Sequence, residues 1–340
     1  MNNLIIIPSL NPTAKLIKLI KELNEKELSN IIIINDGSSN DYNVFFDAAK
    51  KLNCVVINHS KNKGKGSAIK TALKEYEKYF KHITGFITVD SDGQHCTADI
   101  LKIHKELERN QDDIILGIRN FKDKSVPWKS KFGNKFSSWF FKFSTSRKLS
   151  DTQTGLRGIP LKYKELMLNT DGNRFEYEMN FLLAAADYNI NFNLIPIKTI
   201  YNNKNKESHF NPVQDSMRIY KSPLLYIFSS ISSTLIDLTL FTILSNYTSL
   251  IIISYVIARV VSGIYNFELN KMCFQSKGNR RKQFSKFVML FIFTMIISSS
   301  LVKILSITKL NITLIKIMVD TPFFIVNYII QKKYIFKRTK

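Results

Sequence analysis

The stretch FITVDSDGQHCTADILKIHKELE, residues 86–108, contains the structural unit from which the first half of the chain is built. Its apolar run Phe86–Val89 has the length and composition of a buried strand, and Ala98–Glu108 has the periodicity of a helix. Between them lies a polar turn with two acidic residues, Asp90 and Asp92. A strand, a polar turn and a helix in this order form the repeating unit of an α/β fold.

The same unit recurs across the first 120 residues. Further apolar runs predict strands at Leu4–Ile7, Ile31–Ile34, Cys54–Ile57 and Ile114–Leu116. Helical patterns alternate with them near Thr13–Leu23, Val44–Leu52 and Gly66–Tyr79. This alternation predicts a parallel sheet, and such sheets bind their ligands at the carboxyl ends of the strands. The polar turns at these ends are therefore the candidate site.

The turn after Val89 has the most informative chemistry. Asp90 and Asp92 can share a divalent cation, and Gln94 can add a neutral oxygen. Mg²⁺ is commonly held by one or two carboxylates together with the phosphates of a substrate, and Mn²⁺ prefers the same oxygen ligands. An EF-hand is excluded because no Glu follows Asp90 at the required distance. We therefore expect Mg²⁺ or Mn²⁺ here.

Two other polar turns follow the first and second predicted strands, at Pro8–Pro12 and Asn35–Asp41. The carboxylate of Asp36 beside exposed turn backbone suits hydrogen bonding to a nucleoside base and ribose. A turn followed by a helix N-cap is the alternative, and it accounts well for Gly37 and Asp41.

A fourth motif, NKGKGS at Asn62–Ser67, lies at the start of a predicted helix. Free backbone N–H groups and the helix dipole favour anions at such a position. The spacing differs from GxxxxGK[ST] and from GxGxxG, so it indicates neither an ATP-hydrolysing P-loop nor a dinucleotide site.

The second half of the chain differs in charge and hydropathy. Residues 221–340 contain 16 basic and 3 acidic residues, against 33 and 24 in residues 1–220. Four apolar stretches follow, each close to the ~20 residues that cross a ~30 Å hydrocarbon core, at 224–245, 250–270, 287–305 and 311–330. Buried helices of a large soluble domain are the alternative, but these stretches leave no polar faces. The sequence predicts an α/β domain over 1–220 and an all-α four-helix transmembrane domain over 221–340.

The basic residues indicate the orientation of these spans. They cluster in 271–286 and in the tail 332–340, whereas 246–249 has no charge. The positive-inside rule then places both termini and the α/β domain in the cytoplasm of a multi-pass cell-membrane protein. Part of the net charge of +22 should attract anionic membrane lipid. No nucleic-acid motif accompanies the basic residues, so nucleic acid is not an expected partner.

Several other classes are excluded by simple counts. Three scattered cysteines do not make a disulfide scaffold, and five histidines form no zinc-ligand pattern. The apolar run Leu4–Ile7 is too short for a signal peptide.

Polar residues inside apolar spans mark function by default. Asp237, Arg259 and Asp320 lie in mid-span. Arg259 precedes Asn266 by seven residues, and Asp320 precedes Asn327 by the same interval. This weak repeat indicates two related helix pairs, as in transporters. The alternative is that Arg259 and Asp320 pair to hold the bundle together.

The order of these motifs resembles glycosyltransferase family 2, most closely its dolichyl-phosphate mannose synthase and polyprenyl-phosphate glycosyltransferase branch. The resemblance covers about residues 3–220 and includes Gly117–Arg119, Ser150–Arg157, Arg174–Glu178 and Ser208–Phe210. The second half is similar to the GtrA-like family through Arg259, Ser262-Gly263, Asn266-Phe267 and Asn270-Lys271. The two families are often adjacent or fused. The resemblance implies the Rossmann-like GT-A fold for the first domain.

The resemblance also implies roles for individual residues. The nucleotide-sugar site would contain Pro8, Leu10, Asn11, Asp36, Lys65, Asp90, Ser91 and Asp92, with Asp90, Asp92 and Gln94 on the metal. The catalytic residues would be Asp92, Arg119 and Lys131, the last two at the acceptor phosphate or donor diphosphate. The acceptor or sugar would contact Asp151, Arg157, Glu176 and His209. The chain departs from the family at Leu10, usually aromatic, and at Pro12, usually acidic.

The implied reaction is metal-dependent, inverting transfer of a sugar from a nucleotide-sugar to polyprenyl phosphate, such as undecaprenyl phosphate, for cell-envelope glycan modification. UDP-glucose or UDP-N-acetylglucosamine is favoured as donor, with GDP-mannose the alternative. The membrane domain would anchor or translocate the lipid-linked sugar. A flippase with a non-catalytic nucleotide-sugar-binding domain is a second hypothesis, against which the intact Asp90, Asp92 and Gln94 argue. A homo-oligomer is compatible with the sequence.

The segment FGNKFSSWFFKF, residues 132–143, mixes Trp139, several Phe and two Lys. This composition suits an interfacial helix that places its rings at the headgroup boundary. A core helix with exposed lysines is the alternative.

Overall fold

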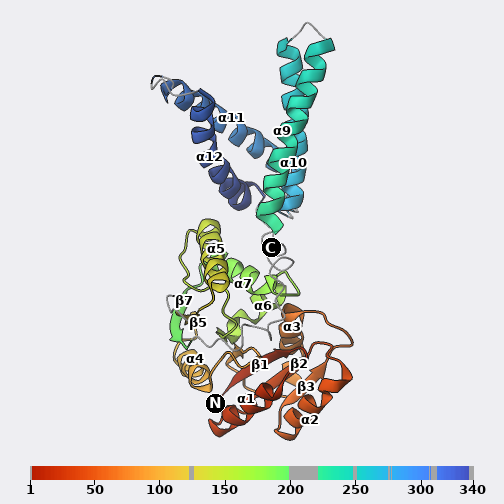
Figure 1. Cartoon of the computed structure of the whole chain (residues 1–340), viewed down its shortest axis with the longest axis vertical. Coiled ribbons are helices and arrows are strands. Elements are labelled where there is room, and N and C mark those ends of the chain that lie inside the picture. Colours follow the sequence, from red (N-terminus) through yellow and green to blue (C-terminus); the bar gives the residue numbers. More distant parts are fainter. Residues whose placement is uncertain are drawn as a thin grey trace. The chain divides into compact units, whose positions relative to one another are not determined.

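The computed structural model describes residues 2–121, 126–198, 221–247, 251–274, 276, 278–305, 307 and 312–336. The chain divides into two compact units, Met1–Ile219 and Tyr220–Lys340. The first is an α/β unit and the second is helical (Figure 1).

In the described part of the first unit, seven strands form one sheet in the order β3-β2-β1-β4-β6-β5-β7. The strands are β1 (Asn3–Ser9), β2 (Ile31–Asn35), β3 (Val55–Asn58), β4 (Gly85–Thr88), β5 (Ile114–Arg119), β6 (Arg157–Pro160) and β7 (Phe192–Ile197). Paired neighbours are parallel except at β6, which runs antiparallel to both β4 and β5.

Helices cover the sheet and bury its central strands (Figure 1). They are α1 (Ala14–Glu25), α2 (Asn43–Lys51), α3 (Lys65–Glu75), α4 (Thr97–Arg109), α5 (Trp128–Thr145), α6 (Lys164–Asn169) and α7 (Glu176–Asp187), with 3₁₀ turns at Asn40–Tyr42, Tyr76–Lys78 and Leu161–Tyr163. All five residues of β2 are buried, as are six of the seven in β1. Strands covered on both faces are continuously apolar, which explains the LIII and IIII runs.

Helix α1 shows how the sequence sets one of these layers. The Oγ1 of Thr13 accepts the backbone N–H of Lys15 at 3.4 Å, so Thr13 is the N-cap. Leu16, Ile20 and Leu23 recur at helical spacing and are fully buried in one core with residues of β1 and β2. Burying each of these three side chains stabilises the fold by roughly 1.5–3 kcal/mol.

The strand–helix pattern predicted the first five strands and the helices between them, and an α/β fold is confirmed. The five predicted strands run in the same direction, but the sheet is mixed because β6, which was not predicted, is antiparallel to its neighbours. Strand β6 has four residues, RGIP, whose Gly and Pro are typical of turns. It becomes a strand because β4 and β5 pair with it on both sides, and this pairing leaves no local signal in the sequence.

The topology brings the candidate loops to one edge. Because β1, β2, β3 and β4 are parallel, the turns after them lie together at their carboxyl ends. Antiparallel β6 begins at that same edge, since Arg157 pairs with Thr88, the last residue of β4. Segment 150–156, which precedes β6, therefore joins the turns after β1 to β4.

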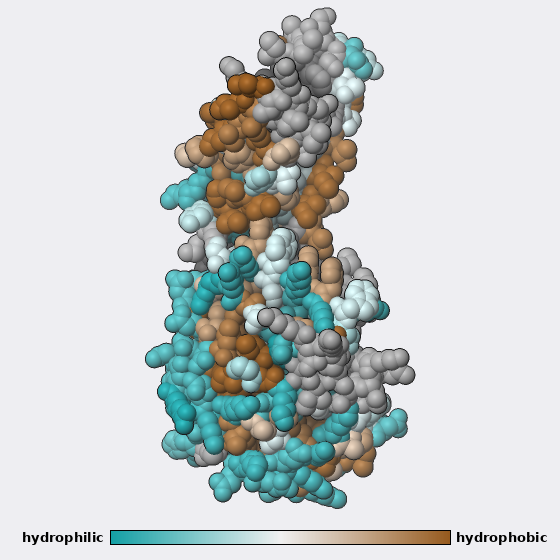
Figure 2. All heavy atoms as spheres, turned by 60° about the vertical axis from the view of Figure 1, so that its left-hand side comes forward, coloured by the Kyte–Doolittle hydropathy of each residue, from teal (hydrophilic) through white to brown (hydrophobic). Residues whose placement is uncertain are grey.

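The second unit consists of helices α9 (Lys221–Tyr247), α10 (Ile251–Cys273), α11 (Arg280–Leu305) and α12 (Ile312–Ile330), with a π-helical turn at Gln331–Ile335. Apart from residues 250 and 311, which lie outside the described residues, these helices contain the four apolar stretches of the sequence. Among the described residues, Leu224–Leu244 is the one helical segment whose length and composition suffice to cross a membrane, and Thr321–Ile330 is a shorter apolar segment. Four spans therefore stay a prediction. Figure 2 shows apolar side chains at the surface of this unit. Phe228 and Leu235 of α9 are each 59% exposed.

Polar side chains join α9 to α10 inside this unit. Asn266 Nδ2 donates to Ser229 Oγ at 3.2 Å and to Ser233 Oγ at 3.1 Å. Asn270 Nδ2 donates to Asn266 Oδ1 and to Gln331 Oε1, both at 2.9 Å.

Two other polar residues singled out in the sequence lie in described parts of these helices. Asp237 is buried in α9, and its Oδ1 accepts from the hydroxyl of Ser262 at 3.1 Å. In α12, Asn327 Oδ1 is buried without a hydrogen-bond partner among the described residues. The side chains of Arg259 and Asp320 lie outside the described residues.

Candidate active site

Lys65 links two acidic residues at the carboxyl edge of the sheet. Its Nζ lies 2.5 Å from Asp90 Oδ1 and 2.9 Å from Glu178 Oε1. Lys65 is the first residue of α3, Asp90 follows β4, and Glu178 lies in the first turn of α7. The side chains of Lys65 and Glu178 are each 12% exposed, whereas Asp90 is 29% exposed. Of the three groups, Asp90 thus offers the most accessible charge.

The charges in this cluster stabilise one another. Burial alone would raise the pKa of Asp90, but the positive charge of Lys65, and in smaller measure that of Arg119, lowers it to about 2. Burial alone would lower the pKa of Lys65, but Asp90 and Glu178 raise it. Asp90 is therefore an ionised carboxylate at neutral pH, and Lys65 is its cation.

His95 supports the backbone of the same turn. Its Nδ1 accepts the backbone N–H of Asp90 at 3.2 Å. Burial lowers the pKa of His95 to about 4, although Asp90 opposes that shift. The imidazole is consequently neutral at pH 7 and can accept this hydrogen bond.

Gly155 makes room for the Asp90 carboxylate. A Cβ built on Gly155 would overlap Oδ2 of Asp90, so any larger residue here would displace the carboxylate. The backbone of Gly155 is held in place because its carbonyl accepts from Thr88 Oγ1 at 2.8 Å. The segment Thr152–Gly155 (TQTG) and the turn Asp90–Asp92 (DSD) thus form one structural unit.

The remaining residues of the DSD turn are half-exposed. Asp92 Oδ1 accepts the backbone N–H of Gln94 at 3.0 Å, and Gly93 between them has a φ of +74°. Ser91, Asp92 and Gln94 are all partly accessible to solvent. Asp90, Asp92 and Gln94 supply only oxygen donors, which fit Mg²⁺ or Mn²⁺. Among the described residues, no three His, Cys, Asp or Glu side chains cluster as a metal site.

Asp36 is buried and bonded to neighbouring loops. Its Oδ1 accepts from His59 Nδ1 at 2.7 Å and from the backbone N–H of Lys63 at 2.9 Å. Its Oδ2 accepts the backbone N–H of Gly64 at 2.7 Å. On the other side of the ring, His59 Nε2 lies 2.9 Å from Thr71 Oγ1 in α3. Asp36 therefore shapes the loop that leads to Lys65.

The turns after β1 and β2 are joined to each other. The backbone N–H of Asp36 donates to the carbonyl of Ser9 at 2.9 Å, and that of Asn11 donates to Ser38 Oγ at 2.8 Å. Asn11 has a φ of +47°, and its Oδ1 is buried without a hydrogen-bond partner among the described residues. Pro8 and Leu10 beside it are half-buried.

The NKGKGS loop packs against the segment before α7. The backbone N–H of Ser67 donates to the carbonyl of Asn173 at 2.9 Å, and Arg174 Nη1 donates to Asn62 Oδ1 at 3.2 Å. Glu176 Oε1 accepts the backbone N–H groups of Asn173 and Arg174, so Glu176 stabilises the start of the helix.

The predicted segment Arg174–Glu178 contains both Glu176 and Glu178, and Glu178 is the one in contact with Lys65.

A second charge cluster lies at the end of β5. Arg119 binds the fully buried Asp151 through two bonds, Nε to Oδ2 at 2.8 Å and Nη2 to Oδ1 at 3.0 Å. Asp151 also accepts the backbone N–H groups of Arg119 and Gln153. The Arg119 side chain is 20% exposed, and its guanidinium lies 5.0 Å from the Phe121 ring centre. Asp151 thus fixes an accessible guanidinium.

The other predicted site residues lie as follows. Arg157 is 2% exposed, and its guanidinium donates to the carbonyls of Thr154 and Glu178, both at 2.9 Å. It therefore joins the segment before β6 to α7. Lys131 is half-buried in the first turn of α5. His209 lies outside the described residues.

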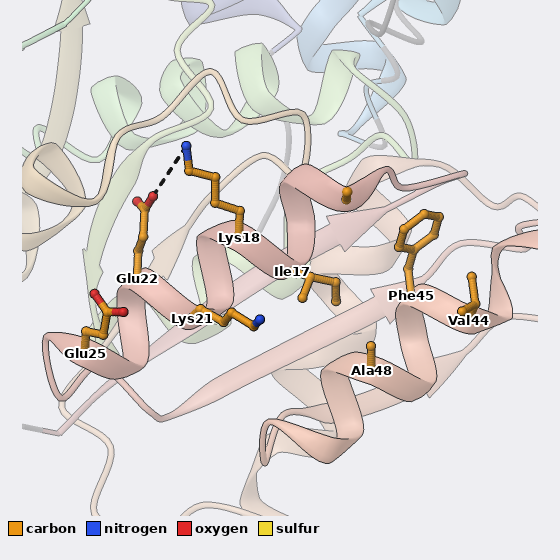
Figure 3. A pocket seen from close by; sticks show the side chains of 9 residues that line it. Ile17, Lys18, Lys21, Glu22, Glu25, Val44, Phe45 and Ala48 are labelled. Carbon is orange, nitrogen blue, oxygen red and sulfur yellow. Dashed lines mark ion pairs between the residues drawn. The ribbon is translucent and has the colours of Figure 1, made fainter.

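A separate groove between α1 and α2 contains none of these residues (Figure 3). Its floor includes Ile17, Phe45 and Ala48, and Lys18 and Glu22 face each other along α1. The groove lies on the helical surface, between α1 and α2.

Comparison with known proteins agrees with this arrangement. Residues 4–160 match Glycosyl transferase family 2, and residues 225–336 match the GtrA/DPMS transmembrane domain. The chain is 30% identical over 215 residues to the UDP-N-acetylglucosamine–dolichyl-phosphate N-acetylglucosaminyltransferase of Methanococcus voltae, over 58% of this chain and 85% of that protein. An uncharacterized protein of Methanocaldococcus jannaschii is 32% identical over 191 residues, 53% of this chain and 80% of that protein.

Among solved structures, the glucosyl-3-phosphoglycerate synthase of Mycobacterium tuberculosis in complex with UDP aligns with a TM-score of 0.49 and 11% identity, over 66% of this chain and 78% of the other.

The fold and site define a membrane-associated glycosyltransferase. The chain belongs to glycosyltransferase family 2 and carries a GtrA/DPMS transmembrane domain, which confirms the resemblance drawn from the sequence.

Proposed function

We propose that this enzyme transfers a sugar from a UDP-sugar to a polyprenyl phosphate at the membrane surface. One observation supports this most directly: the topology places an anionic cluster around Asp90 and a cationic group, Arg119, at the same edge of the sheet. The two are close enough for the Arg119 charge to lower the pKa of Asp90. Transfer between a diphosphate donor and a phosphate acceptor needs both kinds of group near the reacting carbon.

The donor side of the site is formed by the turns after β1, β2 and β4. Asn11 has a buried oxygen without a partner, which suits a donor group on a base or ribose. Asp36 acts there indirectly, by holding the loop before Lys65. UDP-N-acetylglucosamine is the favoured sugar donor because the relative from Methanococcus voltae is named for it. UDP-glucose and GDP-mannose are the other candidates.

Asp90, Asp92 and Gln94 would hold a divalent cation together with the donor diphosphate. When bound, such an ion neutralises negative charge that develops on the leaving group. Lys65 keeps the Asp90 carboxylate ionised and oriented, and Gly155 fixes its position.

The acceptor side is formed by Arg119 and Lys131. Their charges would hold the acceptor phosphate so that one of its oxygens attacks the anomeric carbon of the sugar. The new bond joins C1 to the acceptor phosphate oxygen, and the bond from C1 to the donor diphosphate breaks, releasing the nucleoside diphosphate. A single displacement inverts the configuration at C1. The phosphate is already anionic near neutral pH, so no side chain needs to remove a proton.

The membrane half supports the choice of acceptor. We infer four spans that follow α9 to α12, with both termini and the catalytic unit in the cytoplasm, because the basic loops flank these helices. The membrane domain would anchor the enzyme at its lipid substrate or translocate the lipid-linked sugar for envelope glycan modification.

The test is Asp92→Asn in the full chain, in membranes supplied with labelled UDP-sugars and polyprenyl phosphate. We expect loss of label from the lipid extract, with membrane insertion unchanged. Asp112→Asn is the matched control, because the Asp112 side chain is 90% exposed and pairs with Lys162 on the surface. Full transfer by Asp92→Asn would contradict the assignment. Omitting Mn²⁺ and Mg²⁺ from the wild-type reaction tests the metal separately.

A further inference from the structure

One face of α5 is both aromatic and exposed, although the helix belongs to the catalytic unit. We name this face the aromatic stripe and define it as Trp128, Phe132, Phe136, Trp139 and Phe143. Trp128 is 71% exposed, Phe132 67% and Trp139 55%. Exposed aromatic residues at such density mark an interaction surface.

The stripe is continuous and lies opposite the core. At ~100° per residue its five positions fall within a sector of about 80°. The ring centre of Trp139 lies 5.8 Å from that of Phe136 and 5.6 Å from that of Phe143. The residues buried against the protein occupy the opposite side of the helix: Asn134, Ser137, Phe140, Phe141 and Ser144.

Lysines border the stripe. By the same helical geometry, one edge of the stripe is followed by Lys131, Lys135 and Lys142. Lys129 lies at the other edge. Helix α5 has no acidic residue, so its exposed face carries positive charge only. Rings flanked by lysines are the arrangement of a helix that lies in the plane of an anionic lipid surface. A second copy of α5 would instead bring like charges together.

We propose that α5 docks flat on the bilayer, with the aromatic stripe about 5–10 Å into the headgroup and acyl boundary and the lysines at lipid phosphates. The transmembrane domain of the same chain keeps the bilayer within reach.

The docked helix also bears on the acceptor site, and this part rests on the proposed function. Asn134 Nδ2 donates to the carbonyl of Ser150 at 2.7 Å, and Ser137 is hydrogen-bonded to Thr152. These bonds attach α5 to the segment that carries Asp151, the partner of Arg119. Docking would therefore hold Arg119 and Lys131 at the depth where a polyprenyl phosphate presents its headgroup.

The protein offers a direct probe, because its two tryptophans are both in the stripe. The experiment places the full chain in vesicles of phosphatidylcholine and phosphatidylglycerol with acyl chains brominated at a shallow or a deep carbon. We expect strong quenching of tryptophan emission by shallow bromines and weaker quenching by deep ones. Removing phosphatidylglycerol should reduce the quenching.

The control is the triple variant Trp128→Phe, Trp139→Phe, Val44→Trp, whose one tryptophan replaces a residue of α2 that is 63% exposed. Its emission should be insensitive to bromine. Absence of quenching in the wild type would overturn the proposal and would indicate that protein, either this chain or a second copy, covers the stripe.

Fluorescence needs no sugar transfer, so the docking and the reaction fail separately. Quenching with no transfer to lipid would leave the docking of α5 standing and would overturn the proposed function, together with the link to the acceptor that rests on it.

Discussion

At the scale of single residues, glycine has as much influence on the site as the charged groups. Gly155 contributes no side chain, yet its backbone is the wall against which the Asp90 carboxylate lies. The sequence shows why Asp90 is chemically useful, but it does not show that a residue 65 positions later must be small. That constraint comes from the pairing of β4 with β6.

Replacing Gly155 by Ala should displace the Asp90 carboxylate and leave its charge intact. A misplacement of about 1 Å costs roughly 100-fold in rate, so we expect sugar transfer to fall by that order. The measurement is initial rate at saturating donor and acceptor.

The matched control is Gly133→Ala in α5, where an added Cβ meets only the Gln153 amide, at 3.8 Å. Gly133→Ala should retain the wild-type rate. If both variants are equally active, Gly155 does not position Asp90.

At the scale of elements, the connection from β3 to α3 depends on one buried carboxylate. Asp36 accepts three hydrogen bonds, two of them from the backbone of the loop that enters α3. Hydrogen bonds to a charged group contribute roughly 1.5–3 kcal/mol each. The loop therefore owes its conformation to a residue at the end of β2.

Asp36→Asn should loosen this loop, because an amide has one acceptor oxygen where the carboxylate has two. We expect faster hydrogen exchange at the amides of Lys63 and Gly64, together with a higher KM for the nucleotide-sugar. Asp47→Asn is the control, since Asp47 pairs with Lys50 on the exposed surface of α2. Unchanged exchange in Asp36→Asn would rule out this structural role.

The strands and helices also show which parts of the fold can be predicted from the sequence. Apolar runs predicted β1 to β5, and helical periodicity predicted α1 to α4 to within a few residues, because both signals are local. The antiparallel strand β6 and the contact of Lys65 with Glu178 depend on residues far apart in the chain. The burial of Asp36 and its bond to His59 also depend on the tertiary structure and are not visible in the sequence.

At the scale of the whole molecule, the chain joins a glycosyltransferase to a membrane domain, and the two can be tested apart. Arg259→Ala should leave synthesis of the lipid-linked sugar intact and prevent its appearance on the far leaflet, because a charge in mid-span marks function. The measurement compares labelled lipid made in inverted vesicles with the fraction accessible from the lumen.

Arg281→Ala is the control for this prediction, since Arg281 is exposed at the start of α11. If Arg259→Ala abolished synthesis but left the movement of preformed product normal, the assignment of translocation to the membrane domain would be contradicted.

The amides that join α9 to α10 have a mechanical consequence. Asn266 and Asn270 hold α9 and α10 to each other and to the turn at Gln331, and parting these elements would leave buried amide groups without partners. Any route for a large headgroup past these elements would follow their outer surface, and α11 and the first turns of α12 would have to yield.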